Sequence, residues 1–215
     1  MIPLRTISAA LVALLLSGCA VFGYTLAPAG KAIDVAGSGL LVTPDIAWNR
    51  SGSINGPGKD AERWTLDGPA LNELTFYAGI RDGRPLFREV DRRDRPLPRF
   101  SATMLPPDVA ALFEASYRVA SGTSLFTLNG MGPATLAGHP GFRFRYEYVL
   151  PGEEVRRRGE ATGAMIDGRL YLISFEAPAI HYFERDVGAY RAIVAAARFR
   201  AEAGRGGVST PADPS

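Results

Sequence analysis

One predicted strand constrains the fold of this chain more than any other feature, because it is apolar on both faces. It follows Asp167-Gly168, a dipeptide typical of a two-residue hairpin turn. Alternate positions divide its apolar residues between the two faces: Tyr171, Ile173 and Phe175 on one, Leu170 and Leu172 on the other. A strand of this kind must be covered above and below, so we expect helices on both faces of its sheet.

Other segments predict that the sheet is antiparallel. Phe142, Phe144, Tyr146 and Tyr148 alternate with charged residues, which is the period of a strand with one polar face. Asp82-Gly83 indicates another turn, after a strand predicted over residues 74–80. Successive hairpins favour an α+β fold over a parallel sheet built from βαβ units.

Two amphipathic segments predict the covering helices. The first begins at Pro106-Pro107-Asp108, where proline suits an opening turn and the aspartate suits the helix dipole, and it ends at Ser121-Gly122. The second carries an apolar stripe over about residues 181–199. The sequence therefore predicts an antiparallel β-sheet sandwiched between helices.

This order of elements resembles the PsbP/Mog1-like group. The resemblance covers about residues 38–200 and is carried by a helix before meandering strands, a last strand "YLISFEAP" and a closing helix "YFERDVGAYRAIVAAARF". It implies an α/β/α sandwich. It also implies an accessory or binding role in a larger assembly, although a fold by itself does not transfer a function. The segment "ERWTLDGPALNELTFYAGIRDGRPL" is similar to small lipoproteins of uncharacterised role.

The first twenty residues predict export. Arg5, the apolar run from Ile7 to Leu16 and the small residues before Cys19 are the three parts of a signal peptide. The run is about half the ~20 residues that a membrane-spanning helix needs. An ordinary secretory signal in which the cysteine occurs by chance is the alternative. Cys19 is the only cysteine of the chain, so it has no disulfide partner.

Leu16-Ser17-Gly18-Cys19 resembles the lipobox of bacterial lipoproteins. The resemblance implies cleavage between Gly18 and Cys19, a diacylglyceryl group on the Cys19 thiol and a further acyl chain such as palmitate on the new amino terminus. In two-membrane bacteria, Ala20 in place of aspartate favours the outer membrane, facing the periplasm.

The same patterns predict the organisation of the chain. We expect a signal peptide over residues 1–18, a tether over 19–32, a single α+β domain over 33–203 and a disordered tail over 204–215. The formal net charge of +2 gives no reason to expect a nucleic-acid partner. The expected partners are the membrane, through the lipid on Cys19, and an envelope protein.

A search for chemistry in the sequence finds no catalytic, metal or cofactor motif. His139 is predicted in a turn, and His181 at a helix start, where His181, Glu184 and Asp186 do not all lie on one face. No nucleophile elbow and no glycine-rich phosphate loop occurs. Glu153-Glu154 is interpreted as a solvated hairpin tip. We therefore predict no catalytic residue, no metal ligand and no cofactor.

Arg156-Arg157-Arg158 and the two tryptophans leave alternatives open. The arginines could bind phosphate groups, lipid headgroups or an acidic peptide, but a solvated strand edge is the preferred interpretation. Trp48 and Trp64 are expected to fill the core, with binding anchors as the alternative.

Two functions follow from these observations. We favour a membrane-tethered envelope lipoprotein that acts as a non-enzymatic accessory or partner-binding protein. The alternative is a periplasmic enzyme or small-ligand-binding lipoprotein whose site is assembled from distant residues, as a carboxylate pair would be. A deep pocket that holds a perturbed acid or histidine would favour the alternative.

Overall fold

The computed structural model describes residues 23–51 and 57–200. Its helices are α2 (Pro106–Ser121) and α3 (Tyr182–Ala196). Its strands are β1 (Thr25–Ala27), β2 (Ile33–Asp34), β3 (Leu40–Val42), β4 (Trp48–Arg50), β5 (Ala61–Thr65), β6 (Glu73–Ile80), β7 (Phe126–Leu136), β8 (His139–Val149), β9 (Arg156–Ile166), β10 (Arg169–Pro178) and β11 (Arg198–Phe199).

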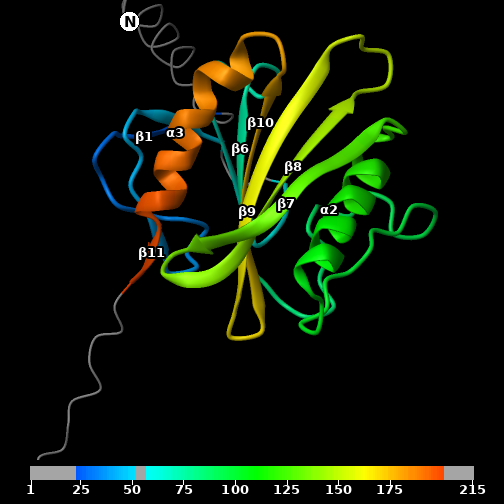
Figure 1. The fold of residues 1–215 in the computed structure, drawn as a ribbon, viewed down its shortest axis with the longest axis horizontal. Coiled ribbons are helices and arrows are strands. Elements are labelled where there is room, and N and C mark those ends of the chain that lie inside the picture. The colour runs from blue at the N-terminus through cyan, green and yellow to red at the C-terminus, as the bar shows by residue number, and fades with distance from the viewer. Residues whose placement is uncertain (1–22, 52–56, 201–215) are drawn as a thin grey trace, which may run out of the picture.

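An eight-stranded sheet forms the centre of the fold, in the order β1-β4-β5-β6-β10-β9-β8-β7. All of its strand pairs are antiparallel. Figure 1 shows the sheet between α3 (orange) and α2 (green), one helix on each side. A smaller antiparallel sheet, β11-β3-β2, lies on the same side as α3. The predicted α+β sandwich is confirmed.

Strand β10 is buried on both faces, as its sequence predicts. Its turn is also the predicted one, because Asp167 and Gly168 both have positive φ angles, of 50° and 70°. Tyr171, Ile173 and Phe175 pack into one core cluster, beneath α3 and the small sheet. Leu170 and Leu172 pack into a second cluster beneath α2.

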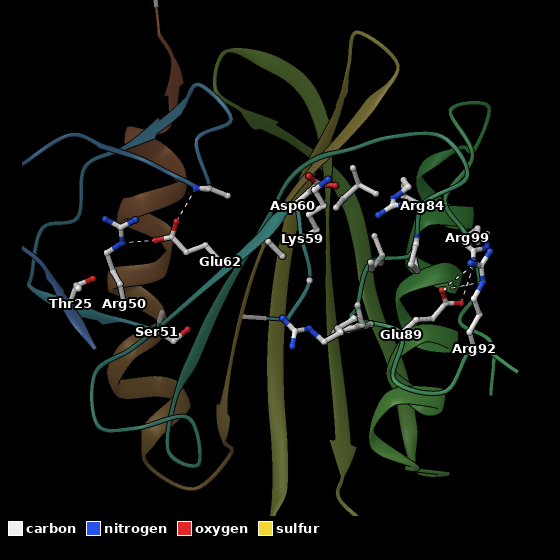
Figure 2. Close-up of a pocket in the computed structure, with 18 residues that line it drawn as sticks. Thr25, Arg50, Ser51, Lys59, Asp60, Glu62, Arg84, Glu89, Arg92 and Arg99 are labelled. Atoms are coloured by element: carbon white, nitrogen blue, oxygen red, sulfur yellow. Dashed lines mark hydrogen bonds and ion pairs between the residues drawn. The ribbon is translucent and has the colours of Figure 1, made fainter. Parts of the chain in front are cut away.

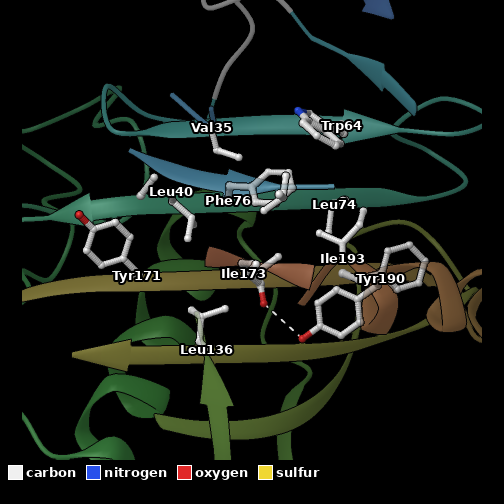
Figure 3. Packing of buried hydrophobic residues seen from close by; sticks show 14 of the residues in the cluster. Val35, Leu40, Trp64, Leu74, Phe76, Leu136, Tyr171, Ile173, Tyr190 and Ile193 are labelled. Carbon is white, nitrogen blue, oxygen red and sulfur yellow. Dashed lines mark hydrogen bonds between the residues drawn. The ribbon is translucent and has the colours of Figure 1, made fainter. Parts of the chain in front are cut away.

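The cluster beneath α3 contains the two largest fully buried side chains of the described residues, both of them tryptophans. Figure 3 shows Ile173 of β10 among Leu74 and Phe76 of β6, with Tyr190 and Ile193 of α3 packed over them. Trp48 and Trp64 are both fully buried here, so the prediction that they fill the core is confirmed. The T-shaped contact of Trp64 with Phe76, at 4.8 Å between ring centroids, is a favoured aromatic geometry.

Half of the buried residues in the cluster beneath α2 are aromatic. Phe113 points from α2 into the sheet and is fully buried. Its ring centroid lies between 5.1 and 6.4 Å from those of Tyr77, Phe87, Tyr117, Phe126, Phe144 and Tyr146. Burying aromatic side chains in this way contributes most of the hydrophobic stabilisation on this face.

Both ends of α2 lie where the sequence predicts them. The Leu105 amide donates a hydrogen bond to the Asp108 carboxylate at 2.9 Å, which satisfies an amide that the helix leaves free. At the other end, Gly122 adopts the left-handed conformation, with a φ of 74°, and its amide donates to the Arg118 carbonyl.

The second helix is shorter than predicted. It ends at Ala196 instead of continuing to residue 199, because Ala197 is extended (φ −66°, ψ 137°) and Arg198–Phe199 form β11. There Phe199 pairs with Leu40 and its ring meets Tyr171 edge-on at 5.0 Å. Tertiary pairing therefore overrides the helical pattern of the last residues.

The structure describes part of the predicted tether but neither the signal peptide nor the tail. The expected tether extends to residue 32, whereas β1 already pairs with β4 over Thr25–Ala27. The predicted signal peptide, the Gly18–Cys19 cleavage site and the tail over 204–215 lie outside the residues that the structure describes. Within residues 23–51 and 57–200, neither helix has the length and hydropathy that crossing a membrane requires.

We expect Phe113→Ala to lower the free energy of unfolding by about 3–5 kcal/mol, because the surrounding rings cannot close the cavity that it leaves. Urea denaturation measures this change. Leu125→Ala removes a side chain that is 65% exposed and should cost no more than about 0.5 kcal/mol. Equal losses in the two variants would contradict the position assigned to Phe113.

Candidate functional site

Strand register places two glutamates side by side at one end of the sheet. Glu176 of β10 lies directly opposite Glu73 of β6. On its other side Glu176 lies opposite Gly159 of β9, which in turn lies opposite Tyr146 of β8. We call Glu73, Glu176, Tyr117, Tyr146 and Tyr148 the Glu176 network; it lies beneath α2.

Three tyrosine hydroxyls donate hydrogen bonds to the Glu176 carboxylate. Tyr148 donates to Oε1 at 2.6 Å and Tyr146 to Oε2 at 3.0 Å. Tyr117, from α2, also donates to Oε2. Glu176 is only 7% exposed. A buried carboxylate is costly unless it is hydrogen-bonded, and these three donors supply that compensation.

Gly159 allows Tyr146 to reach Glu176. The Tyr146 ring crosses over β9 from β8 to β10, and a Cβ atom placed on Gly159 would lie 2.0 Å from its Cζ atom. No side chain larger than hydrogen fits beneath this ring. The absence of a side chain at this one position therefore determines whether the hydrogen bond across β9 can form.

The second acid of the network is Glu73. Its side chain is 15% exposed; Arg63 Nε lies 2.8 Å from its Oε1, although the N–H is not directed at that oxygen, and Thr75 donates to it at 3.1 Å. Burial, and then the charge of Glu176, raise the pKa of Glu73 to about 7, against the opposing effect of Arg63. Glu73 can therefore exchange a proton near neutral pH.

The tyrosines stay protonated donors. Burial, and after it the negative charge of Glu176, raise the pKa of Tyr117, Tyr146 and Tyr148 well above the ordinary value. A phenolate that could act as a base or nucleophile is therefore unavailable at neutral pH. Glu176 accepts hydrogen bonds from these tyrosines on both of its oxygens.

A groove of about 510 Å³ opens over the network. Glu73, Glu176, Tyr148, Arg63 and Arg157 line its polar part. Its apolar part is formed by Pro69, Ala70, Leu71, Phe87, Leu150, Val155 and Pro178, together with Ala120 of α2. The groove thus combines an apolar rim with a carboxylate-rich interior, and its volume is typical of ligand sites.

The three consecutive arginines do not form a solvated strand edge, which corrects that prediction. β9 lies between β10 and β8, inside the sheet. Arg157 is 5% exposed and donates to the Ala70 carbonyl at 2.9 Å, while its Nε has no hydrogen-bond partner. Arg156 and Arg158 project from the other face and pair with Glu147 at 3.1 and 2.9 Å.

The other residues singled out by the sequence do not come together. His139 begins β8 and His181 follows β10; since these strands run parallel to one another, the two exposed histidines lie at opposite ends of the sheet. Glu153 and Glu154 are exposed in the β8–β9 hairpin, as predicted, and Glu153 borders the groove. Over residues 23–51 and 57–200 no cluster of three or more potential metal ligands is found.

Sequence reasoning missed Glu73 and Glu176. The available signal was a carboxylate in an otherwise apolar strand, at Glu176 within "YLISFEAP". A charged residue in a strand buried on both faces requires buried partners. Its partners come from distant parts of the chain, so no spacing rule could identify them.

Comparisons with known proteins give only distant structural likenesses. No protein-family model matches the chain, and no curated protein matches it. Similar solved structures include a cyanobacterial PsbP from Synechocystis sp. PCC 6803, at 11% identity and a TM-score of 0.42, covering 85% of this chain and 96% of that one. PsbP belongs to the group that the element order resembles.

Two further solved structures are similar at the same distant level. PA94, a protein of unknown function from Pseudomonas aeruginosa, has 10% identity and a TM-score of 0.39, covering 79% of this chain and 92% of that one. LpqN, involved in cell envelope biogenesis of Mycobacterium tuberculosis, has 11% identity and a TM-score of 0.33, covering 84% and 86%.

Substitution of Gly159 tests the packing of the network. We expect Gly159→Ala to lower the free energy of unfolding by about 1–3 kcal/mol, because the new methyl group displaces the Tyr146 ring. Gly188→Ala is the matched control: it lies in α3 with open space around it, so it should raise stability by about 0.5–1 kcal/mol. Urea denaturation of both variants decides the question, and two changes of the same sign would contradict it.

The pKa of Glu73 predicts a pH dependence of stability. Because this pKa is about 7 in the folded protein against an ordinary 4.5, Glu73 contributes stability that is full below pH 4.5 and is lost as the pH rises through about 7. Glu73→Gln, which imitates the protonated acid, should match the wild type at pH 5 and exceed its stability at pH 8.

The free energy of unfolding in urea at both pH values measures this effect. Glu154→Gln removes the same charge from an exposed hairpin and should follow the wild-type pH dependence. A Glu73→Gln variant that is no more stable than the wild type at pH 8 would show that Glu73 is ionised at little cost in the folded protein.

Proposed function

We propose that this chain is a cell-envelope lipoprotein, anchored through lipid on Cys19, that binds a partner protein instead of catalysing a reaction. Support for the anchor comes from the resemblance of Leu16-Ser17-Gly18-Cys19 to a lipobox and from the lack of a second cysteine. Two or more acyl chains make such anchoring durable. Ala20 after the cysteine favours the outer membrane, on its periplasmic side.

One observation supports the binding role above all: the groove has an apolar rim, and the Glu176 carboxylate beneath it already accepts hydrogen bonds from three tyrosines. Tyrosine hydroxyls occupy both oxygens of Glu176, and the raised pKa of each tyrosine keeps its proton in place. A carboxylate that already accepts three hydrogen bonds is a weakened base, and a tyrosine that keeps its proton is a weak nucleophile. They rigidify the interior of the groove, which favours recognition of a surface.

The chemistry of the groove favours apolar side chains of the partner. Val155 at the rim is 43% exposed, and Leu150 beside it is partly buried. Glu73 and Glu176 are balanced by Arg63 and Arg157 when both acids are ionised, so the interior carries at most a small net charge near neutral pH. An apolar anchor from an envelope protein, seated against the rim, is the occupant that we propose.

Glu73 favours a second candidate function, a small-ligand site. Its pKa of about 7 within a groove of about 510 Å³ is the combination expected of a site that exchanges a proton with a bound molecule. A ligand that contacts Glu73 should be retained in native mass spectrometry of the purified protein. Glu73→Gln should then release it.

In-cell photocrosslinking tests the partner-binding role. A photoreactive residue at Val155 should capture one defined envelope protein, identified by mass spectrometry. The same residue at Met131, which is 41% exposed on β7 and does not line the groove, is the matched control and should not capture it. Cys19→Ala should abolish capture, because the chain no longer reaches the membrane in mature form.

Each outcome bears on a different part of the proposal. Capture at Val155 and not at Met131 supports the groove as the binding surface. Equal capture at both positions, or at neither, contradicts it. Normal maturation and membrane retention of Cys19→Ala would contradict the lipid anchor, whatever the crosslinking result.

A further inference from the structure

A second cavity, of about 740 Å³, is lined by an excess of basic side chains. We call it the basic cavity; its cations are Arg50, Lys59, Arg84, Arg88, Arg92 and Arg99. Figure 2 shows Arg50 and Glu62 towards one end and Glu89, Arg92 and Arg99 towards the other, with Lys59, Asp60 and Arg84 between them.

Each of the two acids at the ends is paired with an arginine beside it. Glu62 pairs with Arg50 at 2.5 Å and also accepts hydrogen bonds from the Trp64 indole and the Ala36 amide. Both carboxylate oxygens of Glu89 accept a hydrogen bond from the Arg99 guanidinium group, at 3.0 and 3.1 Å. These two carboxylates therefore have little capacity left for other cations.

Three cations of the basic cavity remain free to bind an anion. Among the residues that the structure describes, no ion pair joins Lys59, Arg84 or Arg88 to a carboxylate, and all three are exposed. Asp60 is the one remaining acid of the lining. Guanidinium groups present paired donors that match a phosphate, and an ammonium adds a mobile positive charge.

The basic cavity lies close to the proposed anchor. Thr25 lines it and comes six residues after Cys19. Even a fully extended chain of this length spans only about 20 Å. This step rests on the proposed lipidation of Cys19, which would keep the cavity within that distance of the membrane surface.

We propose that the basic cavity binds the phosphate of an anionic lipid headgroup in the membrane to which the chain is tethered. A negative membrane surface attracts Lys and Arg residues within about one Debye length, ~8–10 Å at physiological salt, and the short tether allows the domain to bring the cavity into that range. The lipid anchor holds the chain at the bilayer, and headgroup binding then fixes which side of the domain faces it.

The two lysines of the sequence, Lys31 and Lys59, allow a direct test. The lipidated protein is reconstituted in phosphatidylcholine vesicles with or without phosphatidylglycerol, and acylation of each lysine by a water-soluble reagent is followed by mass spectrometry. Phosphatidylglycerol should slow the labelling of Lys59 by about fivefold and leave Lys31 unchanged. Lys31 is exposed but does not line the cavity, so it reports any general effect of the membrane.

Charge-matched variants assign the effect to the cavity. Arg84→Gln combined with Arg88→Gln should abolish the selective protection of Lys59. Arg143→Gln combined with Arg169→Gln removes the same charge from exposed strand positions outside the cavity and should retain the protection. Absence of protection, equal slowing of both lysines, or protection that survives Arg84→Gln with Arg88→Gln would overturn the proposal.

A separate experiment distinguishes binding of a lipid headgroup from binding of free phosphate. Inorganic phosphate is added to the protein in detergent micelles, where it should not protect Lys59; equal protection would overturn the assignment to a lipid. Intact mass reports the lipid on Cys19 independently. If that lipid is absent, the anchor fails, and the same vesicles added from solution still test the cavity.

Discussion

Strand β10 has to be covered on both faces, and the layers of the molecule follow from this constraint. Tyr171, Ile173 and Phe175 require α3 and the small sheet on one side, and Leu170 and Leu172 require α2 on the other. Its antiparallel neighbours β6 and β9 then bring distant segments into register. On β10 itself only the face beneath α2 carries a carboxylate, Glu176, near the end of the strand; the buried carboxylates beneath α3, Glu160 and Asp186, come from β9 and from α3 itself.

That carboxylate determines the chemistry of the groove. Taking a charge out of water is tolerated here because tyrosine hydroxyls replace the lost water, and the rings of those tyrosines also form part of the core. The same arrangement raises the pKa of Glu73 on the neighbouring strand. The interior of the groove is thus held by the fold itself, while its rim is apolar and open.

Much of the fold could be predicted from local patterns. The alternation in β8, the Asp-Gly turn before β10 and both ends of α2 are short-range signals, and the structure bears them out. The predicted end of α3 was wrong because Phe199 pairs with Leu40 in the small sheet instead of continuing the helix. The site was not predictable in this way. Glu73, Tyr117, Tyr146 and Glu176 meet only through strand register and the docking of α2, and the position of Arg157 inside the sheet depends on strand order.

The hydrogen bonds to Glu176 also belong to a late stage of folding. They join residues far apart in sequence, and the bond from Tyr146 passes over an intervening strand at Gly159. It can therefore form only after the β8–β9 and β9–β10 hairpins have paired, and the bond from Tyr117 only after α2 has docked. Interactions that form late in folding slow unfolding more than they speed folding. The network should thus act mainly as a kinetic lock that lengthens the folded lifetime of a chain whose single cysteine cannot form an internal disulfide.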